Sequence, residues 1–120
     1  MSSGQVLAAI VSIGGDTSKY PPLPKSSRSE IHFRQLLAGA LSGICTVVPQ
    51  FQVKKFRVDF YIPEFNIPIE YDEPHHSKSK KQDAIRQRDI ESELKSSMIR
   101  VKRGHEVKGV NEVLRRIMDK

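Results

Sequence analysis

Two acidic side chains on neighbouring predicted strands are the residues of this sequence best suited to do chemistry. The loop 63–66 between the strands is short, and if Ile62 pairs with Ile67 across it, Asp59 lies directly opposite Glu70. Directly opposed Cβ atoms are about 5 Å apart, so two like charges there repel each other. A hard divalent cation held by oxygen ligands would compensate this repulsion, which makes the pair a candidate metal site. The alternative is an ordinary solvated polar face of a hairpin.

Further polar residues follow the second of these acids along the chain. Asp72 comes two residues after Glu70, and the same register places it opposite Arg57. His75 and His76 stand at the end of the strand, where functional residues tend to collect. A histidine with a pKa near neutrality can activate water or protonate a leaving oxygen. A surface histidine without any role is the simpler alternative.

Two acids elsewhere in the sequence have explanations that need no active site. Ser27 followed three residues later by Glu30 is the pattern of a capping box, which starts a helix. Asp83 begins a helix-forming segment, and the helix dipole stabilises an acidic residue in the first turn. For Glu30, the cap and an active site would compete for the same side chain.

The elements that must position these residues follow from hydrophobic periodicity. Apolar residues at helical spacing favour helices, and β-branched or alternating segments favour strands. In chain order, the sequence predicts a helix from the cap at 27 to near 43, strands at 46–54, 56–62 and 67–72, a basic loop at 78–81, a helix at 83–94, a strand at 98–102 and a helix at 110–118. Gly104 and Gly109 mark the turn before the last helix. Alternation places one set of side chains on a single face of the second strand: Phe56, Val58, Phe60 and Ile62.

Length and composition limit what kind of protein this is. The 120 residues, 38% of them hydrophobic, suffice for one domain with a short tail, and no apolar run approaches the roughly 18 residues of a membrane span. Cys45 is alone, which excludes a disulfide framework and a cysteine zinc site and favours a reduced, intracellular setting. The net charge of +6 favours a polyanionic partner, of which nucleic acid is the commonest.

The chain divides into an appendage and a folded unit. Residues 1–26 are predicted to be an N-terminal appendage or linker, because Gly14 and Gly15 break any helix begun before them and the proline-rich segment 20–24 is extended. That segment is typical of a spacer, and a ligand for an aromatic groove is the alternative. Residues 27–120 are predicted to form the folded domain.

Four spaced motifs make the folded domain resemble a known nuclease family. The motifs are 56–64 (FRVDFYIPE), 69–76 (IEYDEPHH), 83–86 (DAIR) and 99–101 (IRV). They are similar to the very-short-patch-repair-like (Vsr-like) branch of the PD-(D/E)XK nucleases, the EDxHD group, which includes catalytic domains of phage homing endonucleases. The resemblance covers about 27–118 and implies that 27–120 is an endonuclease-like catalytic domain. It also implies a restriction-endonuclease-like α/β fold, with the order α-β-β-β-α-β-α forming a mixed four-stranded sheet flanked by helices.

The resemblance implies roles for the residues of the predicted hairpin. Asp59 matches the strand aspartate that ligates Mg²⁺, and Glu70 matches the second acidic position, so the two would hold Mg²⁺ with Mn²⁺ as a substitute. His76 stands where this branch places its catalytic histidine, six residues after Glu70. His75 is its neighbour and the less favoured candidate.

The resemblance also implies roles for residues outside that pair. Glu30 matches a catalytic glutamate of the first helix, and Asp83 matches the aspartate that opens the second helix. Arg86 lies one turn later and is a candidate to hold a phosphate or a carboxylate. Asp72 stands where the superfamily has a lysine, as is usual for this branch, and is a further candidate. Glu73 departs from the pattern, because glycine is common at that position.

Together these residues predict a metal-dependent DNA endonuclease of the repair, restriction or homing type. The basic residues predicted to bind the DNA backbone are Lys54, Lys55, Arg57, Lys78, Lys80 and Lys81. The expected location is the cytoplasm of a bacterial or phage-infected cell, without membrane association. No base-reading motif is visible, so a homodimer or a missing DNA-recognition domain is a candidate source of specificity. The alternatives are a non-catalytic DNA-binding or regulatory domain on the same scaffold and an interaction protein that uses segment 20–24.

Overall fold

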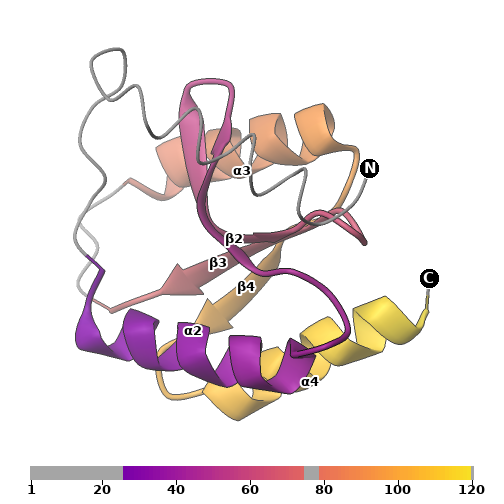
Figure 1. The fold of residues 1–120 in the computed structure, drawn as a ribbon. Coiled ribbons are helices and arrows are strands. Elements are labelled where there is room, and N and C mark those ends of the chain that lie inside the picture. The colour runs from indigo at the N-terminus through magenta and orange to yellow at the C-terminus, as the bar shows by residue number, and fades with distance from the viewer. Residues whose placement is uncertain (1–25, 75–78, 120) are drawn as a thin grey trace, which may run out of the picture.

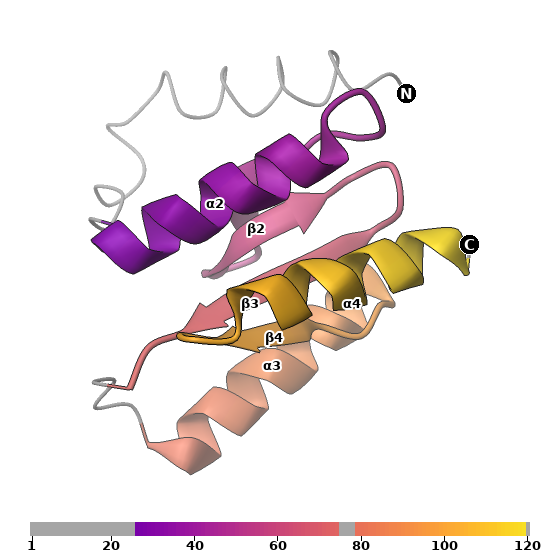
Figure 2. The same cartoon turned by 90° about the horizontal axis from the view of Figure 1, so that it is seen from below.

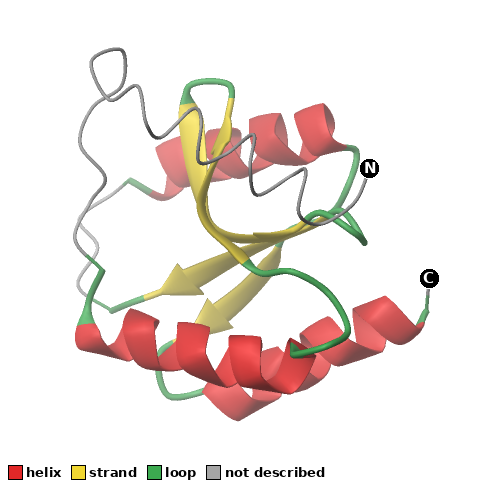
Figure 3. Cartoon of the chain, in the orientation of Figure 1, coloured by secondary structure: helices red, strands yellow, loops and turns green. Residues whose placement is uncertain are grey.

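The described part of the chain has the order α-β-β-β-α-β-α that the sequence predicts (Figures 1 and 3). The protein is described here by a computed structural model over residues 26–74 and 79–119. The elements are helix α2 (Arg28–Leu41), strands β1 (Val48–Val53), β2 (Phe56–Ile62) and β3 (Ile67–Asp72), helix α3 (Lys80–Leu94), strand β4 (Ile99–Lys102) and helix α4 (Glu106–Met118). Almost all of the predicted appendage 1–26 lies outside the described residues. No helix within the described ranges is long and apolar enough to cross a membrane.

The strands form one mixed sheet in the order β1-β2-β3-β4. Strand β2 is antiparallel to both β1 and β3. Strand β4 lies parallel to β3 because α3 carries the chain back across the sheet. Helices α2 and α4 lie side by side on one face, and α3 covers the other (Figure 2). This is the mixed four-stranded sheet flanked by helices that the sequence predicts.

The larger hydrophobic core lies between the sheet and the helix pair α2 and α4. Helix α2 contributes Phe33, Leu37 and Leu41 at helical spacing, and each is fully buried. Helix α4 contributes Val113 to the same cluster. Burying side chains of this size contributes roughly 1.5–3 kcal/mol each relative to leaving them exposed. The sheet residues of this cluster are Phe60, Ile62, Ile67, Ile69, Tyr71, Ile99 and Val101.

Strand β2 does not keep one set of side chains on one face, and this part of the prediction was wrong. Phe60 belongs to the core under α2, whereas Val58 belongs to a second cluster that contains Ile90 of α3. The pairs between β1 and β2 include the neighbours Pro49 and Phe51 but not Gln50, which has a left-handed backbone with φ 51°. This irregularity lies where the alternation changes, so the tip of the β1–β2 hairpin is turned onto α3 (Figure 1). Phe56, at that tip, packs against the second cluster as well.

Helix α3 begins three residues earlier than predicted. The hydroxyl of Ser79 accepts a hydrogen bond from the amide of Gln82 at 3.0 Å and so caps the helix. Lys80 and Lys81 are therefore helical, and the predicted basic loop 78–81 is wrong at these two positions. The cost of ordering their side chains is small because both remain exposed.

Helix α4 also begins earlier than predicted, because Gly109 is part of the helix and not of the turn before it. A Cβ atom at this position would lie 2.6 Å from both methyl carbons of Val101. The glycine therefore lets α4 approach β4 closely, which is why a residue of poor helix propensity is found there. Gly104, with φ +94°, makes the turn as predicted.

Candidate active site

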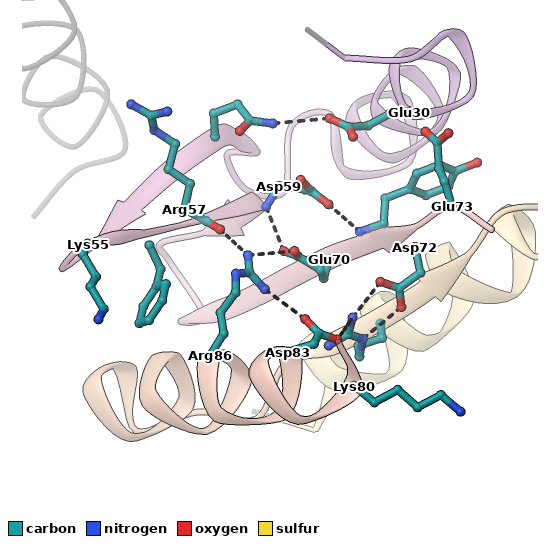
Figure 4. A pocket seen from close by; sticks show the side chains of 14 residues that line it. Glu30, Lys55, Arg57, Asp59, Glu70, Asp72, Glu73, Lys80, Asp83 and Arg86 are labelled. Atoms are coloured by element: carbon teal, nitrogen blue, oxygen red, sulfur yellow. Dashed lines mark hydrogen bonds and ion pairs between the residues drawn. The ribbon is translucent and has the colours of Figure 1, made fainter. Parts of the chain in front are cut away.

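An open pocket of about 670 Å³ lies at the carboxyl end of β3. It receives side chains from both layers of helices and from every strand of the sheet, and Figure 4 shows them converging on the space beside β3. The lining residues are Glu30, Gln50, Lys55, Phe56, Arg57, Asp59, Glu70, Tyr71, Asp72, Glu73, Lys80, Asp83, Arg86 and Arg100. Thus the structure brings together every predicted site residue of the described ranges except two of the predicted DNA-binding lysines.

The two acids of the hairpin lie next to each other, directly after a ladder that has the predicted register. Ile62 pairs with Ile67 and Phe60 with Ile69, and the paired residues end there, at the edge of the pocket. There Glu70 Oε2 accepts a hydrogen bond from the amide of Asp59 at 3.2 Å, and Asp59 Oδ2 accepts one from the amide of Tyr71 at 2.7 Å. Each carboxylate therefore bonds to main chain at or next to the other acid, which fixes both side chains at the edge of the pocket.

Among residues 26–74 and 79–119, Glu70 is the charged residue that is buried, with 7% of its surface exposed. Burial and the nearby charge of Asp59 raise its pKa from 4.5 to about 7. Arg86 opposes this shift, because its Nη2 lies 2.8 Å from Glu70 Oε1 and favours the ionised carboxylate. Glu70 can therefore gain or lose a proton near neutral pH.

Arg86 holds Glu70 from the side of α3. Its Nη2 also donates to the main-chain carbonyl of Arg57 on β2, so the guanidinium bridges the two site strands. Its Nη1 is buried and has no hydrogen-bond partner in the described part of the chain, with Asp83 Oδ1 at 3.8 Å. Buried donors of this kind are uncommon in folded proteins. This buried N–H group is consequently left unsatisfied in a side chain that lines the pocket.

Arg100 of β4 is a residue of the pocket that the sequence did not reveal. Its Nε and Nη2 donate to the two carboxylate oxygens of Asp72 at 2.9 and 2.7 Å. Its Nη2 also lies 2.9 Å from Asp83 Oδ2, and its Nη1 donates to Gln87 at 2.7 Å. The bond to Asp72 raises the pKa of Arg100, so the guanidinium stays charged. The sequence around Arg100 does not indicate these contacts, because their partners lie in distant segments of the chain.

Glu30 faces the pocket although it belongs to a helix cap. The hydroxyl of Ser27 accepts from the amide of Glu30 at 3.0 Å, so the predicted cap is present. The carboxylate does not return to the cap and accepts instead from Ser26 Oγ at 3.1 Å and Gln50 Nε2 at 3.3 Å. Burial and the charge of Asp59 raise the pKa of Glu30. Only one of the two hydrogen bonds of a capping box is therefore formed, and the carboxylate of Glu30 faces the pocket.

The remaining predicted residues differ in where they lie. Lys55 and Lys80 line the pocket, whereas Lys54 forms an exposed ion pair with Glu93 at 3.2 Å. Lys81 lies exposed on α3 and outside the pocket lining. The residues His75, His76 and Lys78 lie outside the described residues.

The carboxylates of the pocket have the chemistry of a site for a hard cation, but they do not form a ready cage. Within the described ranges, no group of three or more histidine, cysteine, aspartate or glutamate side chains is arranged to hold a metal ion. Mg²⁺ is usually held by one or two carboxylates together with substrate phosphates and water, so a pair of acids is enough. The buried carboxylate of Glu70, which the charge of Asp59 repels, fits that requirement together with Asp59.

Comparison with known proteins adds one finding to this geometry. No protein-family model and no curated protein matches the sequence. Among solved structures, the chain is similar to the 5-hydroxymethylcytosine-specific restriction enzyme AbaSI, with a TM-score of 0.55 and 18% sequence identity. The likeness covers 98% of this chain and 47% of the other, so the present chain spans about half the length of that enzyme. The fold is therefore restriction-endonuclease-like, as the sequence predicts.

Proposed function

We propose that this protein is a metal-dependent endonuclease that hydrolyses phosphodiester bonds of DNA. The observation that carries the proposal is the pair Asp59 and Glu70, which lie together at the edge of an open pocket in a restriction-endonuclease-like fold. The structural neighbour is a restriction enzyme, which supports DNA as the substrate class. The basic residues that line the same pocket supply charge for a phosphate backbone.

Asp59 and Glu70 would hold Mg²⁺, with Mn²⁺ as a substitute. When bound, the metal supplies Lewis-acid stabilisation of the negative charge that develops on the phosphate. Arg86 favours the ionised form of Glu70 against burial and the charge of Asp59, and its unpaired Nη1–H is suited to a phosphate oxygen. His76 is proposed as the general acid or base, on the sequence resemblance alone.

The proposal extends to the Vsr-like, EDxHD branch of the PD-(D/E)XK nucleases. Glu30, Asp59 and Asp83 come from three different elements and line one pocket, as that resemblance requires. A bacterial or phage source and a cytoplasmic setting go with this assignment. Because no base-reading motif is visible in the sequence, we propose that a recognition domain or a second copy supplies sequence specificity.

A plasmid-cleavage assay tests the proposal. Wild type is incubated with supercoiled plasmid in Mg²⁺, Mn²⁺, Ca²⁺ or EDTA, alongside the variant Asp59→Asn. A matched control, Asp89→Asn, removes one exposed carboxylate of α3 that is outside the pocket. We expect cleavage by wild type and Asp89→Asn with Mg²⁺ or Mn²⁺ and at least a 100-fold loss in Asp59→Asn, with equal circular dichroism spectra. Equal activity of all three proteins would mean a contaminating nuclease and would contradict the proposal.

A non-catalytic DNA-binding domain on the same scaffold is the second candidate. It is favoured by one observation, the ion pair between Arg86 and Glu70, which compensates the buried carboxylate without any metal. Mn²⁺ binding followed by electron paramagnetic resonance separates the two functions. DNA binding together with no Mn²⁺ binding and intact plasmid in both metals would establish the non-catalytic domain.

A further inference from the structure

A second hollow, of about 270 Å³, lies beside the acidic pocket at the start of α4. Arg100 lines both spaces and forms the wall between them. On the side of the acidic pocket, the guanidinium is occupied by Asp72, Asp83 and Gln87. The residues that line the second hollow are Arg100, Val101, Lys102, His105, Lys108, Gly109 and Glu112.

The sheet register fixes how near this hollow is to the acidic pair. Because β3 and β4 are parallel, their carboxyl ends meet at the same edge, and Asp72 is paired with Lys102. The amide of Arg103 donates to the carbonyl of Asp72 at 2.9 Å, which holds the following turn against the end of β3. The close contact of Gly109 with Val101 then seats the first turns of α4, including Lys108, against β4. The basic residues therefore begin directly beside the last acids of β3.

The lining of this hollow carries more positive than negative side chains. Lys102, His105 and Lys108 are exposed, and Glu112 is the acid among the lining residues. Neither lysine forms an ion pair within 26–74 and 79–119, in contrast to Arg86 and Arg100 on the other side of the wall. Lysine ammonium groups are mobile point charges, which suit phosphodiesters without selecting a base.

We propose that Lys102 and Lys108 bind the DNA backbone next to the phosphodiester that occupies the acidic pocket. This inference rests on the proposed function for its ligand, and it adds a contact surface that the sequence-predicted lysines of the hairpin and of α3 do not include. The surface places DNA across the wall formed by Arg100, with one phosphate at the carboxylates and the neighbouring backbone over β4 and α4. Its contribution to binding is electrostatic and independent of sequence.

Fluorescence anisotropy with a labelled DNA duplex tests this surface, in the Asp59→Asn background so that the probe stays intact. Lys102→Gln with Lys108→Gln removes two charges from the hollow. The matched control, Lys95→Gln with Arg115→Gln, removes two charges from the opposite ends of α3 and α4. We expect the first pair to weaken binding about 10- to 30-fold at physiological salt and to reduce the slope of log K against log salt by about 2. The control should change both quantities by less than half as much.

The outcomes separate this inference from the proposed function. If wild type cleaves plasmid and both double variants bind DNA as tightly as the Asp59→Asn protein, the proposed contact surface is wrong and the proposed nuclease function stands. If both double variants lose affinity to the same extent, the contribution is only net charge, and the surface is again wrong. If the Asp59→Asn protein binds no DNA and wild type cleaves none, the proposed function fails, and the inference fails with it. Thermal melting of each variant controls for folding.

Discussion

The contribution of Glu70 to the stability of this fold should decrease as the pH rises through its titration. Its carboxyl group has a pKa of about 7 in the folded protein, against an ordinary value of 4.5. Between these values the folded state binds the proton more tightly than the unfolded state, so protonation stabilises the fold. This stabilisation is complete below pH 4.5, decreases as the pH rises, and is lost above about pH 7. The cause is burial, followed by repulsion from Asp59.

The size of the effect follows from the shift. Each pKa unit corresponds to about 1.4 kcal/mol, so the ionisation of Glu70 lowers the free energy of unfolding by roughly 3 kcal/mol between pH 4 and pH 8. Replacing the residue by glutamine removes the titration and keeps an oxygen for the amide of Asp59. Glu70→Gln also leaves Arg86 without its carboxylate, which adds an offset that does not change with pH. The pH dependence of the difference in free energy of unfolding between wild type and Glu70→Gln therefore reports the ionisation of Glu70.

Urea unfolding at half-unit steps from pH 4 to pH 8 measures this difference. We expect the free energy of unfolding of wild type minus that of Glu70→Gln to decrease by about 3 kcal/mol, with most of the change between pH 4.5 and pH 7. In Asp59→Asn the midpoint should move to lower pH, because one cause of the shift is gone. A difference that is flat across this range would refute the electrostatic account of the buried acid, whatever the protein does to DNA.

Three further predictions concern the surrounding fold. Gly109→Ala should lower the free energy of unfolding by about 1–3 kcal/mol in thermal melts, because the new methyl group meets Val101 at 2.6 Å. The matched Gly39→Ala, with open space around it in α2, should raise the same quantity by up to about 1 kcal/mol, and an equal effect at both sites would contradict the close approach. Arg100→Gln should cost about 2 kcal/mol in urea unfolding, since two carboxylates lose their guanidinium, and Arg100→Lys should recover part of this. Ser79→Ala should cost about 1 kcal/mol by the loss of the α3 cap, and an unchanged melting temperature would be evidence against that cap.

The hairpin that carries the acids could be predicted because its determinants are local. A short loop and strict alternation near it fix the pairing of Ile62 with Ile67, since a slip by one residue would expose the core side chains. Farther from the loop, the prediction that Val58 and Phe60 share a face was wrong. The left-handed residue Gln50 is on the partner strand, and β2 itself contains no sign of it.

The features that the sequence did not reveal depend on contacts between distant segments. The sequence predicts Gly109 in the turn before the last helix, whereas it lies inside α4 and admits Val101 of the neighbouring strand. Arg100 bonds to Asp72, 28 residues earlier, through a register that exists only once β3 and β4 are parallel neighbours. Pattern analysis of single elements cannot predict such pairs, because each partner looks ordinary in its own segment.

The charge balance of the pocket leads to a last prediction, on how a metal and DNA depend on each other. Six acids and five bases line the pocket, so it is close to neutral although it is rich in carboxylates. A nearly neutral site attracts a divalent cation weakly, and a DNA phosphate would add the missing negative charge. We therefore expect the affinity for Mn²⁺ to rise at least tenfold when a non-cleavable phosphorothioate duplex is present, and the affinity for that duplex to rise equally when Mn²⁺ is present. Electron paramagnetic resonance measures the first affinity and anisotropy the second. Equal Mn²⁺ affinities with and without DNA would contradict this prediction. They would show that the positive charges of Arg86 and Arg100 do not weaken metal binding.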